Sequence, residues 1–315
     1  MNYLDQSLIN LYGRVYIDNG VINFYNTGSG LSFKFRGTTL TATFTDGVGQ
    51  KLHIYIDDND LGIKYIEEQT VLCENLTDDV HVIKVIRVNS EVRGIISLTG
   101  ISGVEEYLPS DPKPTLKFEF YGDSITAGYG VNVDGSEDTI SNEDGTVTYA
   151  YKTVEHFNAQ ASYLCYSGVS VSLPYWVEWI VPDRFKGYSY STKLDEWDFT
   201  KFIPDIVVIN LGTNDSGKIS PNDGSSELFK DRYYKFLVDL RKKYKDASII
   251  CSYGMMGVEP NILKGIKEAV ELMNDSKIYA LEFVPVNCEA LYGHPSKMGH
   301  IDGANQLIKF IESII

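Results

Sequence analysis

Hydrophobic and polar residues alternate along the first third of the chain. The alternation is clearest at residues 31–36, 40–44, 51–57, 81–88 and 94–101. A period of two, interrupted by Gly, Asn and Asp, is typical of short antiparallel strands that bury one face. We therefore predict an all-β sandwich of the jelly-roll type over residues 1–108.

The pattern changes after a proline-rich stretch. Residues 108–114 contain three prolines in seven positions. Proline disfavours a helix or a central strand and favours an extended connector. We therefore predict a linker at 109–115 and a second domain at 116–315.

Apolar runs and helical spacing alternate in this second domain. Strands are expected at 118–121, 161–166, 204–211, 248–253 and 278–284, and helices at 149–157, 227–244, 261–274 and 298–314. The usual outcome is an α/β fold in which helices cover a parallel sheet. The loops after such strands lie at the sheet's carboxyl edge, where ligands bind.

Composition narrows the class of protein and of partner. The chain of 315 residues is 43% hydrophobic and 23% charged, as in ordinary soluble globular proteins. A net charge of -15 disfavours nucleic acid and anionic membranes as partners and favours a neutral substrate. The first six residues lack the basic and apolar parts of a secretory signal, so we expect a cytoplasmic protein.

The sequence suggests neither a metal nor a cofactor. Cys73, Cys165, Cys251 and Cys288 are scattered without a CxxC pair, so we expect buried thiols. The acidic residues 57–60 do not follow the spacing of a calcium loop and lie between two strand-like segments. A hairpin turn is the better interpretation there.

Four loops that follow apolar elements carry residues suited to nucleophilic catalysis. Ser124 lies in a Gly-Asp-Ser turn, Gly168 in a Ser-Gly turn and Asn214 in a Gly-Thr-Asn-Asp turn, and His294 precedes Pro295. A serine hydroxyl attacks only when a base takes its proton and donors stabilise the oxyanion. These residues supply a nucleophile, donors and a base. The structural alternative is that Ser124 only caps a helix.

The order and spacing of these motifs resemble the SGNH (GDSL-type) hydrolase family. Residues 122–124 are similar to its first block, Gly168 to its second, 212–215 to its third and 294–295 to its last. The resemblance implies a flavodoxin-like catalytic domain and no cofactor. The Gly-x-Ser-x-Gly elbow of α/β-hydrolases occurs nowhere in the chain.

The resemblance also assigns roles to single residues. It implies that Ser124 attacks an ester carbonyl and that His294 acts as general base and then as general acid. It implies that the oxyanion binds the N–H groups of Ser124 and Gly168 and the Asn214 side chain. His300, in the expected last helix, is a weaker candidate for the base.

A sandwich joined by a proline-rich stretch to such a domain is similar to carbohydrate esterase family 2, whose members remove acetyl groups from xylan, mannan or related sugars. This resemblance includes residues 13–16 and 118–130. It implies a carboxylic ester hydrolase that acts on an acetylated oligosaccharide. Asp123, Trp176 and Tyr292 are the expected substrate-binding residues.

The chain departs from both families next to the histidine. The SGNH pattern places an aspartate three residues before it, and carbohydrate esterase family 2 often has one two residues before it. Here those positions are Leu291 and Tyr292. We therefore expect a Ser124–His294 dyad. The resemblance to dyad-bearing family members implies that a backbone carbonyl orients the imidazole, and Glu289 is the alternative partner.

The sequence is also compatible with three other functions. The first is nucleotide binding, because residues 212–219 are one residue short of a P-loop. Ile219, at the last position, lacks the hydroxyl that holds magnesium there. A non-catalytic carbohydrate-binding protein is a second alternative, because the usual acid is missing. A third is an esterase that acts on lipid or aryl esters.

Overall fold

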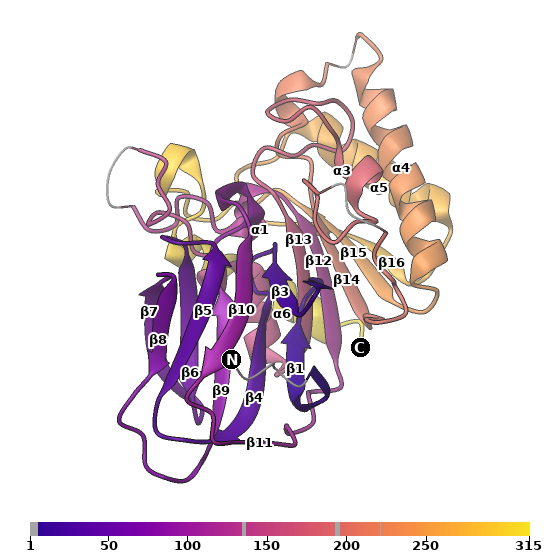
Figure 1. Cartoon of the computed structure of the whole chain (residues 1–315). Helices are drawn as coiled ribbons and strands as arrows, with labels where there is room; N and C mark the ends of the chain where they lie inside the picture. The colour runs from indigo at the N-terminus through magenta and orange to yellow at the C-terminus, as the bar shows by residue number, and fades with distance from the viewer. Residues whose placement is uncertain (1–5, 134–136, 193–195, 221) are drawn as a thin grey trace.

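The computed structural model describes residues 6–133, 137–192, 196–220 and 222–315. The strands of its N-terminal part are β1 (Ile9–Tyr12), β2 (Val15–Asp18), β3 (Val21–Phe24), β4 (Gly30–Arg36), β5 (Leu40–Asp46), β6 (Lys51–Ile56), β7 (Asn59–Tyr65), β8 (Gln69–Cys73), β9 (Val80–Arg87), β10 (Ile96–Ser102) and β11 (Glu106–Leu108). They form two antiparallel sheets packed face to face (Figure 1).

The two sheets confirm the expected sandwich. One has the order β1-β4-β9-β6-β7, with β11 paired to β4, and the other has the order β2-β3-β10-β5-β8. Asp57 and Asp58 have φ values of 50° and 64° and form the tight turn between β6 and β7. This is the backbone of a two-residue hairpin, as expected for residues 57–60.

The C-terminal part contains a parallel sheet. Its strands are β12 (Lys117–Gly122), β13 (Gln160–Cys165), β14 (Ile206–Asn210), β15 (Ser248–Tyr253) and β16 (Ile278–Glu282). The order β13-β12-β14-β15-β16 is that of a flavodoxin-like sheet, which confirms the expected fold class. Gly122 lies opposite both Cys165 and Asn210, so the loops after β12, β13 and β14 start side by side.

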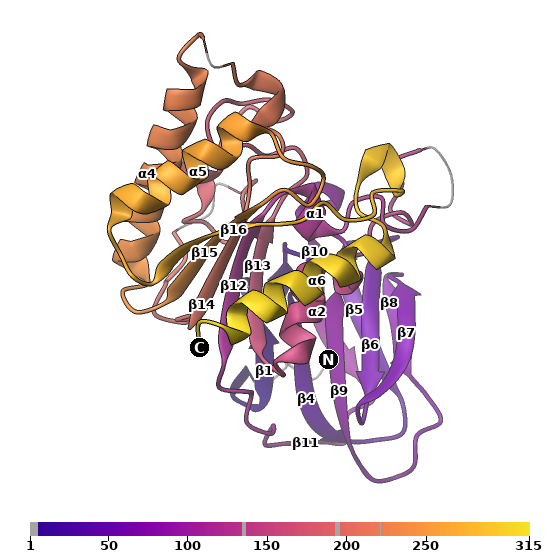
Figure 2. The same ribbon diagram turned by 180° about the vertical axis from the view of Figure 1, so that it is seen from behind.

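Helices cover both faces of this sheet. They are α1 (Ser124–Ala127), α2 (Tyr149–His156), α3 (Val181–Arg184), α4 (Ser225–Lys243), α5 (Pro260–Met273) and α6 (Lys297–Glu312), with the 3-10 helices η1 (Gln6–Leu8), η2 (Glu91–Arg93), η3 (Gly145–Val147), η4 (Ser216–Lys218) and η5 (Leu291–Gly293). Figure 2 shows α2 and α6 on one face and α4 and α5 on the other. In the part of the chain described, no helix is long and apolar enough to cross a membrane.

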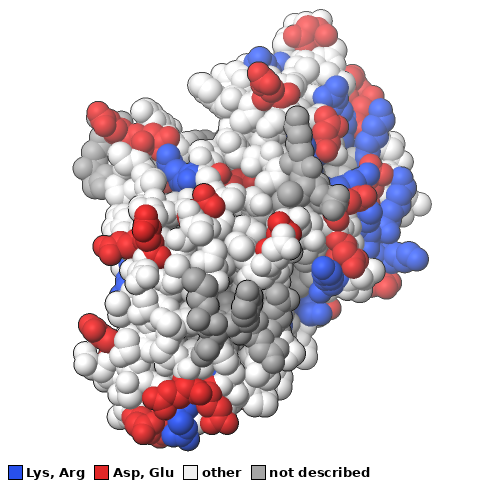
Figure 3. Space-filling model, in the orientation of Figure 1, with Lys and Arg blue, Asp and Glu red and all other residues white. Residues whose placement is uncertain are grey.

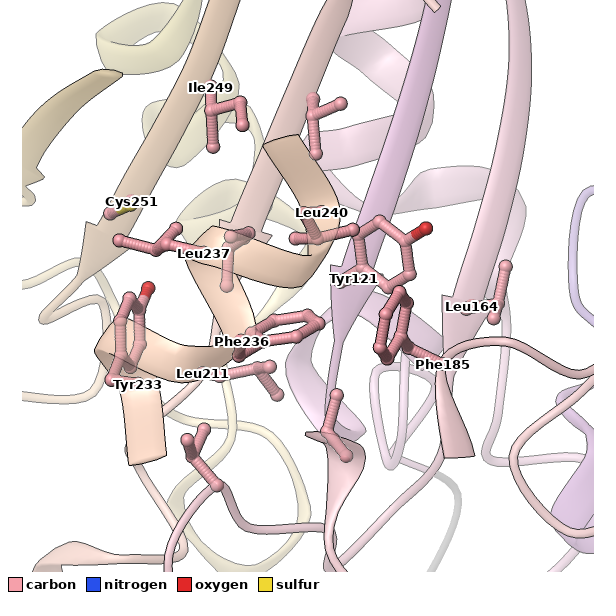
Figure 4. Close-up of a cluster of buried hydrophobic side chains, with 14 of the residues drawn as sticks. Tyr121, Leu164, Phe185, Leu211, Tyr233, Phe236, Leu237, Leu240, Ile249 and Cys251 are labelled. Atoms are coloured by element: carbon pink, nitrogen blue, oxygen red, sulfur yellow. The ribbon is translucent and has the colours of Figure 1, made fainter. Parts of the chain in front are cut away.

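The spacing of apolar residues on α4 explains its packing. Tyr233, Phe236, Leu237 and Leu240 lie on one helical stripe and are fully buried against the sheet (Figure 4). Every element named above from the sequence lies within two residues of its observed bounds.

The cysteines differ in one case from the expectation. Cys73, Cys165 and Cys251 are buried and free, but Cys288 is only partly buried, because it lies in the loop between β16 and η5.

A buried ion pair joins the sandwich to the parallel sheet. Arg14, between β1 and β2, lies 3.0 Å from Glu119 of β12, and neither side chain is exposed. The guanidinium also donates to the Tyr121 hydroxyl and to two backbone carbonyl oxygens at 2.6 and 2.7 Å. The hydroxyls of Tyr121 and Tyr244 donate to the other oxygen of Glu119. Both charges are therefore compensated at the interface.

We predict that Arg14→Met lowers the free energy of unfolding by about 3–5 kcal/mol, because Glu119 would keep a buried, uncompensated charge. The matched control is Arg36→Met. Its pair with Asp78 is long, at 3.7 Å, and exposed, so the loss there should be at most about 1 kcal/mol. Urea unfolding, monitored by tryptophan fluorescence, measures the free energy of unfolding of both variants. Equal losses in the two variants would contradict the interface role of Arg14.

Candidate active site

Ser124 lies at the carboxyl edge of the parallel sheet, where β12 turns into α1. It is the first residue of α1, so its N–H belongs to the helix end that lacks intrahelical acceptors. The preceding Asp123 caps the helix, and its carboxylate accepts a hydrogen bond from Ile125 N at 2.9 Å. The turn therefore presents the serine at the sheet edge.

Asp123 is not placed where we expected it. We expected it to bind substrate, but its side chain is fully buried and does not line the cleft described below. Burial raises the pKa of this carboxyl to about 7. The reason is local, because its carboxylate turns to cap α1 at Ile125 N, which in this fold lies inside the protein.

His294 meets Ser124 from the other end of the domain. Its Nε2 lies 2.8 Å from Ser124 Oγ, and its Nδ1 lies 2.9 Å from the carbonyl oxygen of Leu291. A carbonyl oxygen only accepts, so Nδ1 carries the proton and Nε2 is left to accept from the serine hydroxyl. Glu289, the alternative partner, is exposed, and among the described residues the imidazole nitrogens bond to Leu291 O and Ser124 Oγ rather than to Glu289.

The turn that carries His294 is packed against the loop that follows α1. Leu291 N donates to Gly130 O at 3.3 Å, and Ala290 N donates to His294 O at 3.1 Å. Gly130 has a φ of +68°, and a Cβ there would lie 2.5 Å from Leu291 Cβ. The serine loop and the histidine loop therefore fit together only because residue 130 is glycine.

The pKa of His294 is lowered from its usual value. Burial is the main cause, and the hydrogen bond to Leu291 O opposes it. The imidazole is consequently neutral at neutral pH, as a general base must be. His300 is buried in α6, where its Nδ1 accepts from Tyr149 N at 3.2 Å. It does not line the cleft, so it is placed as a structural residue.

Two further donors stand near the serine. Gly168 follows β13 with a φ of +86°, and a Cβ there would lie 2.6 Å from Trp176 Cβ. Its N–H donates to no acceptor in the described part of the chain. Asn214 follows β14, and its Nδ2 donates to Val169 O at 2.8 Å, which leaves one N–H of the amide for another acceptor.

Asp215 fixes the two donor loops to each other. Its buried carboxylate accepts from Val171 N at 2.9 Å and from both N and Oγ of Ser172, at 2.8 and 2.6 Å. The same loop runs into η4 rather than into an α-helix. A P-loop requires a helix that starts at its phosphates, so the structure does not support the nucleotide alternative.

These groups line one open cleft of about 640 Å³. It contains the four expected residues Ser124, Gly168, Asn214 and His294, and with them Val92, Tyr129, Asp138, Ser167, Trp176 and Tyr292. The side chains of Trp176 and Tyr292 are 71% and 69% exposed. Figure 1 places α1, which begins at Ser124, at the end of the parallel sheet. Among the described residues, no three acidic, His or Cys side chains are grouped to hold a metal ion.

Sequence reasoning missed four residues of the cleft, of which Ser167 directly precedes the expected Gly168. Val92 belongs to η2 of the sandwich, outside the domain where we expected the site. Asp138 lies in a polar loop without a motif. Tyr129 is part of the stretch around Ser124, and its place five residues after the serine was the only available signal.

The chain resembles several known proteins. It is 29% identical over 291 residues to the cellulase/esterase CelE of Acetivibrio thermocellus, a match that covers 87% of this chain and 35% of that protein. The chain thus spans about a third of that relative. It is 22% identical over 328 residues to an acetylxylan esterase / glucomannan deacetylase of Cellvibrio japonicus, covering 98% and 89% of the two chains.

A solved structure and a family model agree with these relatives. A family two carbohydrate esterase from Clostridium thermocellum, in complex with cellohexaose, superposes with a TM-score of 0.88 at 26% identity and covers 97% of this chain and 98% of that one. The model of the GDSL-like lipase/acylhydrolase family matches residues 120–296, more than half of the chain. The chain belongs to the GDSL-like lipase/acylhydrolase family.

Proposed function

We propose that the chain is a serine esterase that removes O-acetyl groups from oligo- or polysaccharides such as those derived from xylan or mannan. The observation that carries this proposal is the 2.8 Å contact between Ser124 Oγ and His294 Nε2, in a cleft that also holds the donors Gly168 and Asn214. A nucleophile, a base and oxyanion donors in one cleft are the parts of an acyl-transfer site.

The geometry supports a reaction in two halves. His294 Nε2 takes the proton from Ser124 Oγ as the oxygen attacks the acetyl carbonyl carbon. The negative oxygen is stabilised by the backbone N–H groups of Ser124 and Gly168 and by the side-chain N–H of Asn214. The ester bond then breaks, and the sugar hydroxyl leaves with the proton from His294. Water attacks the acetyl-serine with the same base, which releases acetate and restores the serine.

Two features support a carbohydrate as the group that carries the ester. Trp176 and Tyr292 expose most of their rings at the cleft, and aromatic rings offer apolar faces on which sugars stack. The net charge of -15 fits a neutral substrate. On the face in Figure 3, Lys and Arg gather along the edge where α4 lies.

Acetate release from acetylated xylo- and manno-oligosaccharides tests the proposal, with positional analysis of the products. A parallel series of 4-nitrophenyl acetate, butyrate and longer esters tests the acyl group. We expect acetate release and a preference for acetyl. A preference for long acyl chains would support a lipid esterase instead. Sugar binding without hydrolysis of any ester would support a non-catalytic binding protein.

We predict that Ser124→Ala and His294→Ala each lower kcat by a factor on the order of 10⁴ to 10⁶, because nucleophile and base act as one unit. Combining both changes should add little to either. Hydrolysis of 4-nitrophenyl acetate measures this, and a Ser124→Ala enzyme with wild-type turnover would overturn the assignment.

We predict that Asn214→Ala lowers kcat by about 10² to 10³, the usual effect of losing one oxyanion donor. Asn305→Ala is the control, because Asn305 is exposed on α6, away from the cleft. Steady-state kinetics on the same ester compare the two variants. A loss confined to KM would mean that Asn214 holds the substrate rather than the oxyanion.

We predict that kcat/KM rises with pH along a limb whose midpoint lies below about 6.5, the usual pKa of histidine. The sign follows from the base, which works only when neutral. Since burial lowers the pKa of His294, the neutral form persists to lower pH and activity is lost only as pH falls through that lowered pKa. A pH profile of ester hydrolysis measures the limb, and a midpoint above that of free histidine would contradict the expected environment.

A further inference from the structure

The catalytic histidine lacks a negatively charged partner. When His294 takes the serine proton it becomes a cation, and in triads a carboxylate stabilises that cation. Here Nδ1 contacts the neutral carbonyl oxygen of Leu291. Within the described ranges no carboxylate contacts the His294 ring. Some other group must favour the protonated form during catalysis.

Tyr129 is placed to do this. Its ring centroid lies 4.9 Å from that of His294, with an angle of 52° between the two ring planes. The face of an aromatic ring carries partial negative charge and attracts a cation within about 6 Å of its centroid. Tyr129 also lines the cleft that holds Ser124 and His294.

Tyr129 is itself held in place by two further side chains. The Asp138 carboxylate lies close to the tyrosine hydroxyl, and burial and this negative charge raise the pKa of Tyr129 to about 12. Asp138 forms an ion pair with Arg93. Arg93 Nε also lies 3.1 Å from Oε2 of the buried Glu143. The tyrosine therefore stays neutral and is anchored to a fixed charge network.

The anchor comes from the other domain. Arg93 belongs to η2, between β9 and β10 of the sandwich, and its neighbour Val92 lines the cleft. Glu143, which Arg93 contacts, also accepts a hydrogen bond from Ser90 N of the sandwich. A continuous line of contacts thus runs from the sandwich through Asp138 to the Tyr129 ring, which packs against the His294 ring.

We propose that Tyr129 is a positioning residue that holds the His294 ring and stabilises its protonated form, and that Arg93 of the sandwich fixes Tyr129 through Asp138. This inference rests on the proposed esterase function. It gives the sandwich a direct part in the active site.

The other groups around His294 do not supply this charge. Ser124 of α1 is neutral, and Tyr292 of η5 is exposed. His300 of α6 is buried and neutral, because burial lowers its pKa to about 3. The charges of Asp138 and Arg93 pair with each other beyond the tyrosine ring. Removal of the Tyr129 ring is therefore the direct test.

The first experiment does not depend on turnover. The pKa of His294 is measured by NMR titration of its ring C–H signal, assigned with His294→Ala, in the wild type, Tyr129→Leu and Tyr129→Phe. Loss of the ring face should lower the pKa of His294 by about 0.5 units in Tyr129→Leu. Tyr129→Phe keeps the ring and should leave that pKa unchanged.

Tyr65→Leu is the matched control, because Tyr65 is exposed on β7, away from the cleft, and it should leave the titration unchanged. An unchanged or raised His294 pKa in Tyr129→Leu would overturn the inference even if the enzyme is an esterase. If Tyr129→Leu lowers the His294 pKa as expected but the wild-type protein hydrolyses no ester, the ring contact is retained and the proposed function is overturned.

The second experiment separates positioning from substrate contact. Tyr129→Leu should lower kcat about 5- to 30-fold with little change in KM, and Tyr129→Phe should lower it less. Asp138→Ala should also lower kcat without raising KM, because it acts through the tyrosine. Asp78→Ala, which removes the exposed partner of Arg36 in the sandwich, is its control. An effect of Asp138→Ala confined to KM would show that this residue binds substrate instead.

Discussion

The contact between Ser124 Oγ and His294 Nε2 joins residues 170 positions apart, and much of the domain is arranged around it. The serine begins the short helix that follows the sheet's first strand, and the histidine comes from the turn before the last helix. Parallel strands deliver the loops of Ser124, Gly168 and Asn214 to one edge. The close fit of Gly130 against Leu291 then brings the histidine turn to the same place.

The replacement of the usual acid by a carbonyl has two physical consequences. The Leu291 carbonyl fixes the proton on Nδ1, so Nε2 can act as the base. A neutral acceptor stabilises the imidazolium less than a carboxylate does, and burial lowers the pKa of His294 further. The base is therefore available at neutral pH, while its protonated form needs support, which we infer comes from the Tyr129 ring.

The sequence predicted those residues of the site whose chemistry is encoded by a local motif. Ser124, Gly168 and Asn214 follow apolar strands, and His294 precedes a proline, so their convergence follows from the topology. The carbonyl partner was implied by the resemblance to dyad-bearing family members, since Leu291 and Tyr292 occupy the positions where an aspartate is usual. Asp123 was misplaced, because only the backbone turn decides that it caps α1. Val92 and Arg93 were not predictable, since their place at the cleft depends on how the sandwich docks, with Arg14 and Glu119 buried between the domains.

The most direct test of the central claim is to identify the covalent intermediate. The enzyme is mixed rapidly with an aryl acetate, quenched in acid and digested, and the acetylated peptide is identified by mass spectrometry. The account predicts an acetyl group on Ser124 that accumulates in the burst phase and is absent from Ser124→Ala. Acetyl transfer to another residue, or burst hydrolysis that persists in Ser124→Ala, would contradict it.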